Sequence, residues 1–120
     1  MKFCWCTIMV GNLEESLKFY QEIVGLSVAR RFAAGPNTEI AFMDGGGAEI
    51  ELLCESGHPA PGNKEGISLG FEVGSVDEQM KLVREKGISI EGGPVQPNPR
   101  VKFFFVKDPN GVTIQFVENM

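Results

Sequence analysis

Hydrophobic residues follow two periodicities along this chain, one typical of strands and one typical of helices. Strand-like apolar runs at residues 3–10 and 67–73 are each followed by apolar residues at helical spacing, namely Leu13, Leu17, Tyr20 and Val24, and then Val76, Met80 and Val83. Each helical segment is followed by three more extended runs, at residues 26–33, 38–43 and 48–54 and at residues 88–95, 101–107 and 112–118. The pattern predicts the order β-α-β-β-β, present twice.

Local signals mark the ends of both predicted helices. Asn12 and Ser75 are suitable N-cap residues, and each is followed three positions later by glutamate, the spacing of a capping box. Gly25 and Gly87 stand where a left-handed residue commonly closes a helix. The two helices are therefore expected to begin and end at equivalent points.

The two halves also match each other when the sequence is shifted by about 62 to 64 residues. Val10 then falls on Val73, and the turn at residues 44–47 falls on the turn at residues 108–111. Residues rich in Gly and Pro separate the two copies, as in a linker. We interpret the chain as a single domain, residues 1–120, with a first module at 1–56, a linker at 57–66 and a second module at 67–120.

Strand alternation predicts which side chains share a face. In the first strand, Val10 leads into the helix, so its face is expected to form the core together with Cys4, Cys6 and Ile8. The opposite face of the first sheet is then expected to carry Trp5, Thr7 and Met9 from one strand and Glu49, Glu51 and Leu53 from another. The opposite face of the second sheet is expected to carry Ser68, Gly70 and Glu72 from one strand and Thr113, Gln115 and Val117 from another. The run Phe103–Phe105 is expected to give at least one ring to each face.

Composition excludes several classes of function. A net charge of −5 lacks the basic footprint of a nucleic-acid-binding protein, and no apolar run approaches the roughly 20 residues of a membrane-spanning helix. One histidine cannot supply a metal site that needs several. Cys4 and Cys6 lie two residues apart on a strand, a poor geometry for a disulfide, so free thiols and a cytoplasmic location are expected.

Two motifs carry a resemblance to a known family. Residues 10–20 with Gly25 and Leu26, and the segment Asp108–Phe116, resemble the opening strand and helix and the closing hairpin of the vicinal oxygen chelate superfamily. This superfamily includes glyoxalase I, extradiol dioxygenases and bleomycin-resistance proteins. The resemblance implies an α+β fold in which two tandem βαβββ modules form a curled mixed sheet around a cavity, with the helices outside. It also implies a homodimer.

The resemblance further implies where a metal would be held in metal-dependent relatives. Four positions supply ligands there, and they fall here on Trp5, Glu51, Ser68 and Gln115. Only Glu51 is a good ligand, because indole cannot coordinate and the other two are weak neutral donors. No metal and no other cofactor is expected.

The sequence therefore favours a metal-independent protein of bleomycin-resistance type that binds a small, planar or cationic molecule, with no nucleic-acid or membrane partner. The expected ligand-binding residues are Trp5, Thr7, Met9, Glu51, Ser68, Phe105 and Gln115. Glu51 is a candidate base, although it also fits a solvated acid, and Trp5 also fits a packing residue. The alternatives are a metal-dependent lyase, isomerase or dioxygenase with a degenerate metal site, and a sensor or subunit without chemistry.

Overall fold

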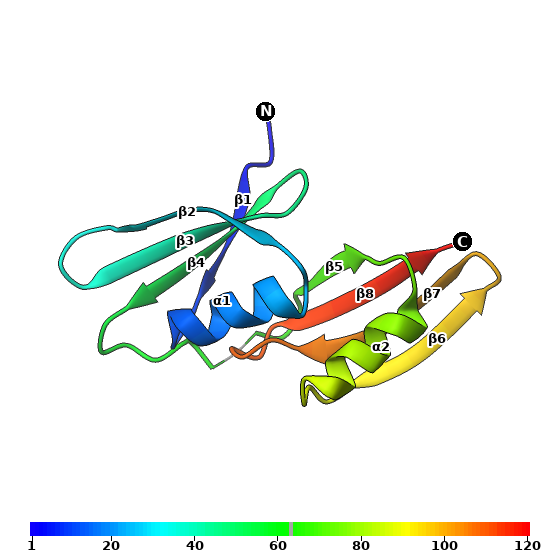
Figure 1. Ribbon diagram of the computed structural model, residues 1–120. Coiled ribbons are helices and arrows are strands. Elements are labelled where there is room, and N and C mark those ends of the chain that lie inside the picture. Colours follow the sequence, from blue (N-terminus) through cyan, green and yellow to red (C-terminus); the bar gives the residue numbers. More distant parts are fainter. Residues whose placement is uncertain (63) are drawn as a thin grey trace. The chain divides into compact units, whose positions relative to one another are not determined.

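The computed structural model describes residues 1–62 and 64–120, which form two compact units, Met1–Gly62 and Asn63–Met120 (Figure 1). The boundary falls in the segment 57–66 that the sequence suggests as the joint; Asn63 itself lies outside the described residues. Each unit contains one helix and one four-stranded mixed sheet in the order β-α-β-β-β. The predicted α+β fold of two repeated modules is confirmed.

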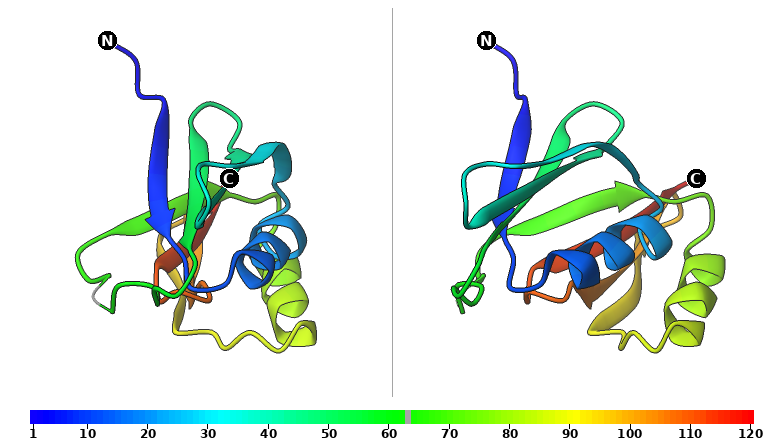
Figure 2. Two further views of the ribbon diagram at one scale, coloured as in Figure 1. Left: turned by 90° about the vertical axis from the view of Figure 1, so that its left-hand side faces the viewer. Right: turned by 60° about the vertical axis from the view of Figure 1, so that its left-hand side comes forward.

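In the first unit the strands are ordered β1-β4-β3-β2. Its elements are β1 (Trp5–Met9), α1 (Leu13–Glu22), β2 (Ser27–Ala33), β3 (Thr38–Asp44) and β4 (Glu49–Glu55). Strands β1 and β4 run parallel, whereas β4, β3 and β2 are joined as antiparallel neighbours. Helix α1 crosses one face of this sheet and leaves the other face without a helix of its own unit (Figure 2).

The second unit repeats this arrangement, with strand order β5-β8-β7-β6. Its elements are β5 (Ser68–Glu72), α2 (Val76–Glu85), β6 (Gly92–Asn98), β7 (Val101–Lys107) and β8 (Thr113–Asn119). The strand predicted at residues 88–95 begins later, because the Ile88 amide donates to the Val83 carbonyl and so still belongs to the helix end. In the described parts of both units, no helix is long and apolar enough to cross a membrane.

Both helices begin as the sequence predicts. The Asn12 side chain accepts a hydrogen bond from the Glu15 amide at 2.9 Å, and the Ser75 hydroxyl accepts one from the Glu78 amide at 3.2 Å. These caps satisfy an otherwise unpaired amide in the first turn of each helix. Each helix contacts the strands of its own unit.

The core of the first unit lies between α1 and the sheet face that carries Ile8 and Val10. Both residues are buried, as their place on the first strand predicts. They share the interior with Leu17 and Tyr20 of α1 and with Leu52 of β4. The expectation that Cys4 joins this core is wrong: its thiol is exposed, because β1 begins only at the next residue.

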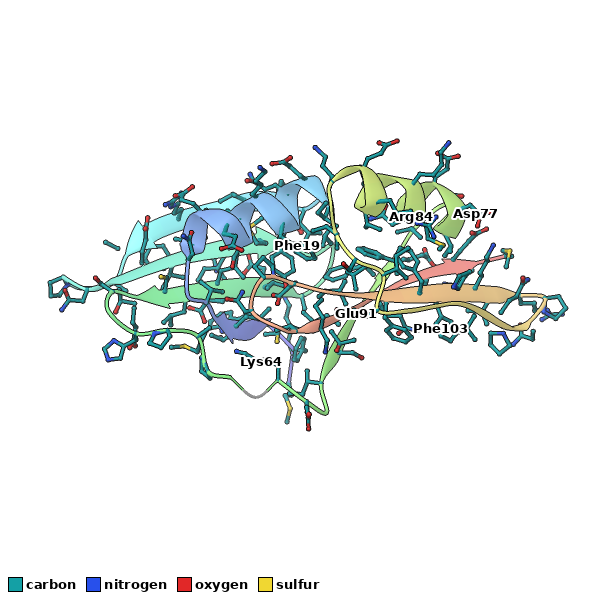
Figure 3. The ribbon with its side chains drawn as sticks, turned by 90° about the horizontal axis from the view of Figure 1, so that it is seen from below. Phe19, Lys64, Asp77, Arg84, Glu91 and Phe103 are labelled. Carbon is teal, nitrogen blue, oxygen red and sulfur yellow. The ribbon has the colours of Figure 1, made fainter. Side chains whose placement is uncertain are left out.

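The second unit is packed in the same way, with Val76 and Val83 of α2 buried over β7 and β8. The rings of Phe104 and Phe116 lie 5.3 Å apart in this core. Phe103 lies on the opposite side of the sheet from α2 (Figure 3). The run of three phenylalanines thus supplies rings to both faces, as predicted.

Arg31 connects α1 to the sheet, because its guanidinium bonds both Glu14 of the helix and Glu39 of β3. The Arg31 hydrogen bond lowers the pKa of Glu39. A carboxylate with a lowered pKa contributes stability above its unfolded pKa and loses it as the pH falls through its folded pKa.

We therefore expect Arg31→Ala to lower the thermal unfolding midpoint at pH 7 and to have a smaller effect at pH 3, because the stabilisation from the Glu39 carboxylate is lost as the pH falls. Thermal unfolding followed by circular dichroism at both pH values checks this. Arg100→Ala, in the exposed turn after β6, serves as the control and should show no such pH dependence. An equal loss for Arg31→Ala at pH 3 and pH 7 would contradict the ionic origin.

Candidate ligand-binding site

The sheet face of the first unit turned away from α1 carries a buried carboxylate. Glu51 is only 9% exposed and lies between Thr7 on β1 and Phe42 on β3 in the strand register. The Thr7 hydroxyl donates a hydrogen bond to Glu51 Oε1. This hydrogen bond satisfies one oxygen of a buried acid and fixes the direction of its side chain. The alternation that predicts Thr7 and Glu51 on one face is therefore correct.

Aromatic rings and an arginine surround this carboxylate. Trp5 is 47% exposed, and its ring meets Phe42 edge-on with the centroids 5.1 Å apart. The Arg30 guanidinium lies 3.9 Å from the centroid of the same ring. Phe32 stacks near Phe42 as well, at 6.2 Å. The face thus combines planar apolar surface with a stacked cation.

Arg30 is held in place by Glu49. Its two terminal nitrogens bond the two carboxylate oxygens at 2.8 and 2.9 Å, a bidentate pair. The hydrogen bond with Glu49 raises the pKa of Arg30, and the charge of Glu51 acts in the same direction. Arg30 therefore stays charged and orders one edge of the aromatic surface.

A hollow of about 390 Å³ adjoins this surface. Trp5 and Glu49 line it together with Lys2, Asp44 and residues of the neighbouring turn. This volume falls within the range of small-molecule pockets, and charges of both signs stand at its wall. The first unit alone thus offers a planar wall, carboxylates and space for a small ring system.

The corresponding face of the second unit carries Ser68, Gln115 and Phe105. Gln115 lies beside Gly70 on β5 and beside Phe105 on β7. Ser68 is exposed at the start of β5, and Phe105 meets Phe103 edge-on at 5.6 Å. These three predicted residues therefore lie on one face of the second sheet, the face that α2 does not cover. The predicted residues of the first unit lie on the equivalent face of their own sheet.

The donor set does not fit a resident transition metal. Trp5 offers only an N–H donor, Ser68 and Gln115 offer weak neutral oxygens, and Glu51 is the single carboxylate among the four positions. In residues 1–62 and 64–120, no group of three or more His, Cys, Asp and Glu side chains could hold a metal ion. We derive no step through a metal at these positions.

Sequence reasoning misses Arg30 and Phe42 as parts of this face. Alternation places Glu49 on the same face as Glu51, but it does not show that Arg30 reaches both Glu49 and Phe42 across two strands. Met9, which is predicted to line the site, is half-buried and lies beside Leu53, one row along the same face from Thr7. The cluster of Trp5, Thr7, Arg30, Phe42, Glu49 and Glu51 is called the unit-1 cluster below.

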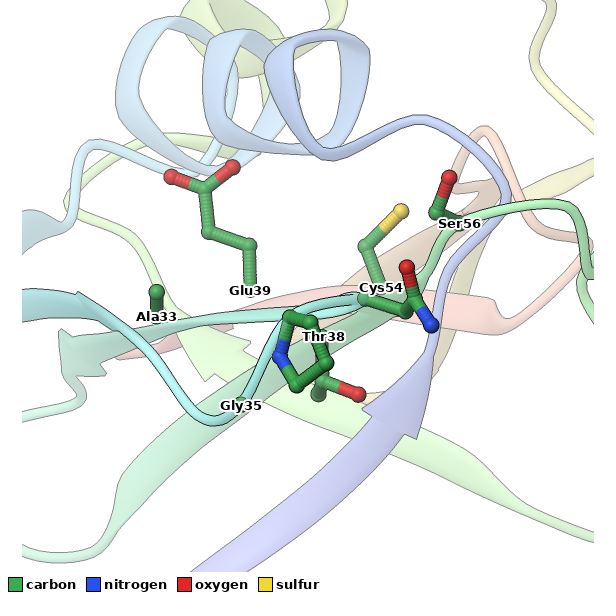
Figure 4. Close-up of a pocket in the computed structure, with 8 residues that line it drawn as sticks. Ala33, Gly35, Thr38, Glu39, Cys54 and Ser56 are labelled. Carbon is green, nitrogen blue, oxygen red and sulfur yellow. The ribbon is translucent and has the colours of Figure 1, made fainter.

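A second hollow lies under the tip of the β2–β3 hairpin (Figure 4). It is lined by the turn at residues 35–37 and by Glu39, Cys54 and Ser56. Glu39 is engaged by Arg31, and the Cys54 thiol lies 3.9 Å from the Gly11 carbonyl. Cys54 lies beside Glu39 in the strand register, but the Glu39 carboxylate is paired with Arg31, so the unit-1 cluster is the stronger candidate site.

Comparisons with known proteins agree with this fold. A family profile described as the Glyoxalase/Bleomycin resistance protein/Dioxygenase superfamily matches residues 2–116. The lactoylglutathione lyase of Haemophilus influenzae is 33% identical over 130 residues, covering 99% of this chain and 93% of the relative. That of Neisseria meningitidis serogroup A is 31% identical over 128 residues, covering 98% and 91%.

Solved structures of the same fold superpose over nearly the whole chain. The trypanothione-dependent glyoxalase I of Leishmania major matches with a TM-score of 0.85 and 22% identity, covering 98% of this chain and 86% of that one. A glyoxalase family protein from Bacillus cereus matches with a TM-score of 0.83 and 23% identity, covering 100% and 95%. At these identities the likeness establishes the fold.

Proposed function

This chain belongs to the Glyoxalase/Bleomycin resistance protein/Dioxygenase superfamily, and we propose that it binds a planar, cationic small molecule at the unit-1 cluster without a resident metal. The observation that carries the proposal is the pairing of Trp5 with Glu51. At positions where metal-dependent relatives would place two ligands, this chain has an aromatic wall and one carboxylate held by Thr7.

Physical chemistry supports this ligand class. A planar cation can stack on the exposed ring of Trp5, because the faces of aromatic rings attract positive charge. Glu51 stands beside those rings, so it can accept a hydrogen bond or pair with the cation. The net charge of −5 also favours the approach of cations over anions.

The test is a fluorescence titration with 9-aminoacridine, a planar cation, and with acridine-9-carboxylate, a planar anion of the same ring system. We expect the cation to bind, the anion to bind at least tenfold more weakly, and the cation's affinity to be unchanged in excess EDTA. Binding that requires added Zn²⁺ or Ni²⁺, or equal affinity for both probes, would refute the proposal.

A lyase is the second candidate, and the relatives favour it over a bleomycin-resistance type of binding. Two relatives named lactoylglutathione lyase are 31–33% identical to this chain over almost its whole length. We still place ligand binding first, because the four residues at the metal-ligand positions do not fit a metal ion. Assaying the protein for lactoylglutathione lyase activity, with and without Zn²⁺ or Ni²⁺, separates the two: metal-dependent activity would establish the lyase.

The homodimer and the cytoplasmic location expected from the sequence stay predictions, which a mass measurement in solution and cell fractionation would check.

A further inference from the structure

Because the two units repeat the same fold, residues at equivalent positions can be compared between them. On the face away from its helix, each sheet is crossed by a row of four residues, one from each strand. In the first unit the row is Thr7, Glu51, Phe42 and Arg30. In the second unit the equivalent row is Gly70, Gln115, Phe105 and Gly92. At the two inner positions the rows are similar, with Glu51 or Gln115 beside a phenylalanine. At the two outer positions they differ, because the first row has Thr7 and Arg30 where the second has glycines.

In the first unit, the two outer residues of the row, Thr7 and Arg30, contact the two inner ones, Glu51 and Phe42. The Thr7 hydroxyl bonds Glu51, and the Arg30 guanidinium lies over Phe42. Glycine at both ends of the second row supplies neither a hydroxyl nor a cation. The Gln115 carboxamide and the Phe105 ring therefore lack the covering groups that their counterparts have.

The fold itself does not call for glycine at position 70. Gly70 lies within β5, and its φ is outside the left-handed region. A Cβ added there would meet Gln115 Oε1 at 3.8 Å, an ordinary contact. Glycine inside a strand costs stability, and where backbone geometry does not require it, it often marks the close approach of a ligand or another backbone.

Charges next to this row are already engaged. On one side Lys107 Nζ donates to Thr113 Oγ1 at 2.9 Å. On the other side Glu72 accepts a hydrogen bond from the Asn119 side chain. The group nearest to Gly70 is the neutral carboxamide of Gln115, which can both donate and accept. The two flanking charges are opposite in sign and leave no net charge beside the row, so the surroundings suit a neutral partner.

We propose that this row of the second unit is a subsite for a neutral planar group that carries an amide or carbonyl. The group lies over Gly70, hydrogen-bonds the Gln115 carboxamide and contacts the Phe105 ring. The inference rests on the proposed function only in taking the chain to bind small molecules, and it assigns to the second unit a ligand class of its own.

The probe is benzamide, compared with benzoate and benzamidine, which share its ring and differ in charge. Each is titrated into the full-length ¹⁵N-labelled protein and followed by two-dimensional NMR. We expect benzamide to shift the Gly70 backbone and Gln115 side-chain resonances saturably, and each charged analogue to bind there at least tenfold more weakly. Equal binding of benzoate or benzamidine at these resonances would overturn the assigned class.

Adding a side chain at Gly70 tests whether benzamide binds over this residue. Gly70→Thr places on β5 the residue that the first unit has at the equivalent position, and it should weaken benzamide binding at least tenfold without lowering the thermal midpoint. Gly70→Ala, a smaller change, should weaken binding several-fold. The control Gly74→Thr, beyond the end of β5 with no atom within 4 Å of its added Cβ, should bind as the wild type does.

Unchanged benzamide affinity in folded Gly70→Ala and Gly70→Thr would refute the subsite. This failure is distinguishable from a failure of the proposed function, because 9-aminoacridine reports on the unit-1 cluster through different residues. A protein that binds 9-aminoacridine but no benzamide would keep the proposed function and discard this inference.

Discussion

Gly93→Ala is expected to destabilise the folded protein by about 3 kcal/mol or more. Gly93 has a φ of 89°, a conformation that costs an alanine strain. An added Cβ would lie 2.9 Å from the Phe103 carbonyl oxygen and 3.0 Å from the Phe104 Cα. Both atoms belong to the backbone of β7, which is paired on both sides and cannot move aside cheaply. Chemical denaturation followed by circular dichroism measures the loss.

Gly87→Ala is the matched control for this experiment. Gly87 has a similar φ of 76°, but a Cβ added there has no atom within 4 Å. Its replacement should cost only the strain of a left-handed alanine, about 1–2 kcal/mol. Equal losses for the two variants would show that the contact with β7 adds nothing.

The architecture could be predicted from the sequence because its signals are local and repeated. Asn12 and Ser75 cap helices by reaching amides three residues away, a distance that a sequence pattern encodes directly. The weakest prediction is the strand at residues 88–95. The observed β6 pairs with β7 through three residues with a register shift after each of the first two, and it contains two prolines, so apolar alternation does not mark its register.

For the candidate site, the sequence predicts which side chains share a sheet face but not which of them contact one another. Period-two alternation places Thr7 and Glu51 on one side, and their hydrogen bond follows from that placement. The neighbours Arg30 and Arg31 have separate roles on opposite faces, one stacked on Phe42 and the other bonded to α1. A register shift between Val28 and Arg30 sets which of them faces which way, and no sequence pattern reveals that shift.

This division between the two arginines provides the sharpest test of the unit-1 cluster. Arg30 is a planar cation already stacked on Phe42 and paired with Glu49, so it competes with a cationic ligand for the same groups. Arg30→Ala should therefore strengthen 9-aminoacridine binding, by up to about tenfold, because it exposes a ring face and a carboxylate. Arg31→Ala, an identical change on the opposite face, should leave the affinity unchanged.

Trp5→Ala should act in the opposite direction and weaken 9-aminoacridine binding at least tenfold, because the exposed ring supplies the stacking wall. Titrations of the four proteins under one buffer, each with its thermal midpoint recorded, give the comparison. Weaker binding in Arg30→Ala would contradict this competition and show that Arg30 supports the binding surface instead of occupying it. Unchanged binding in Trp5→Ala would place the ligand away from the unit-1 cluster, since the Trp5 indole is the exposed ring of that cluster.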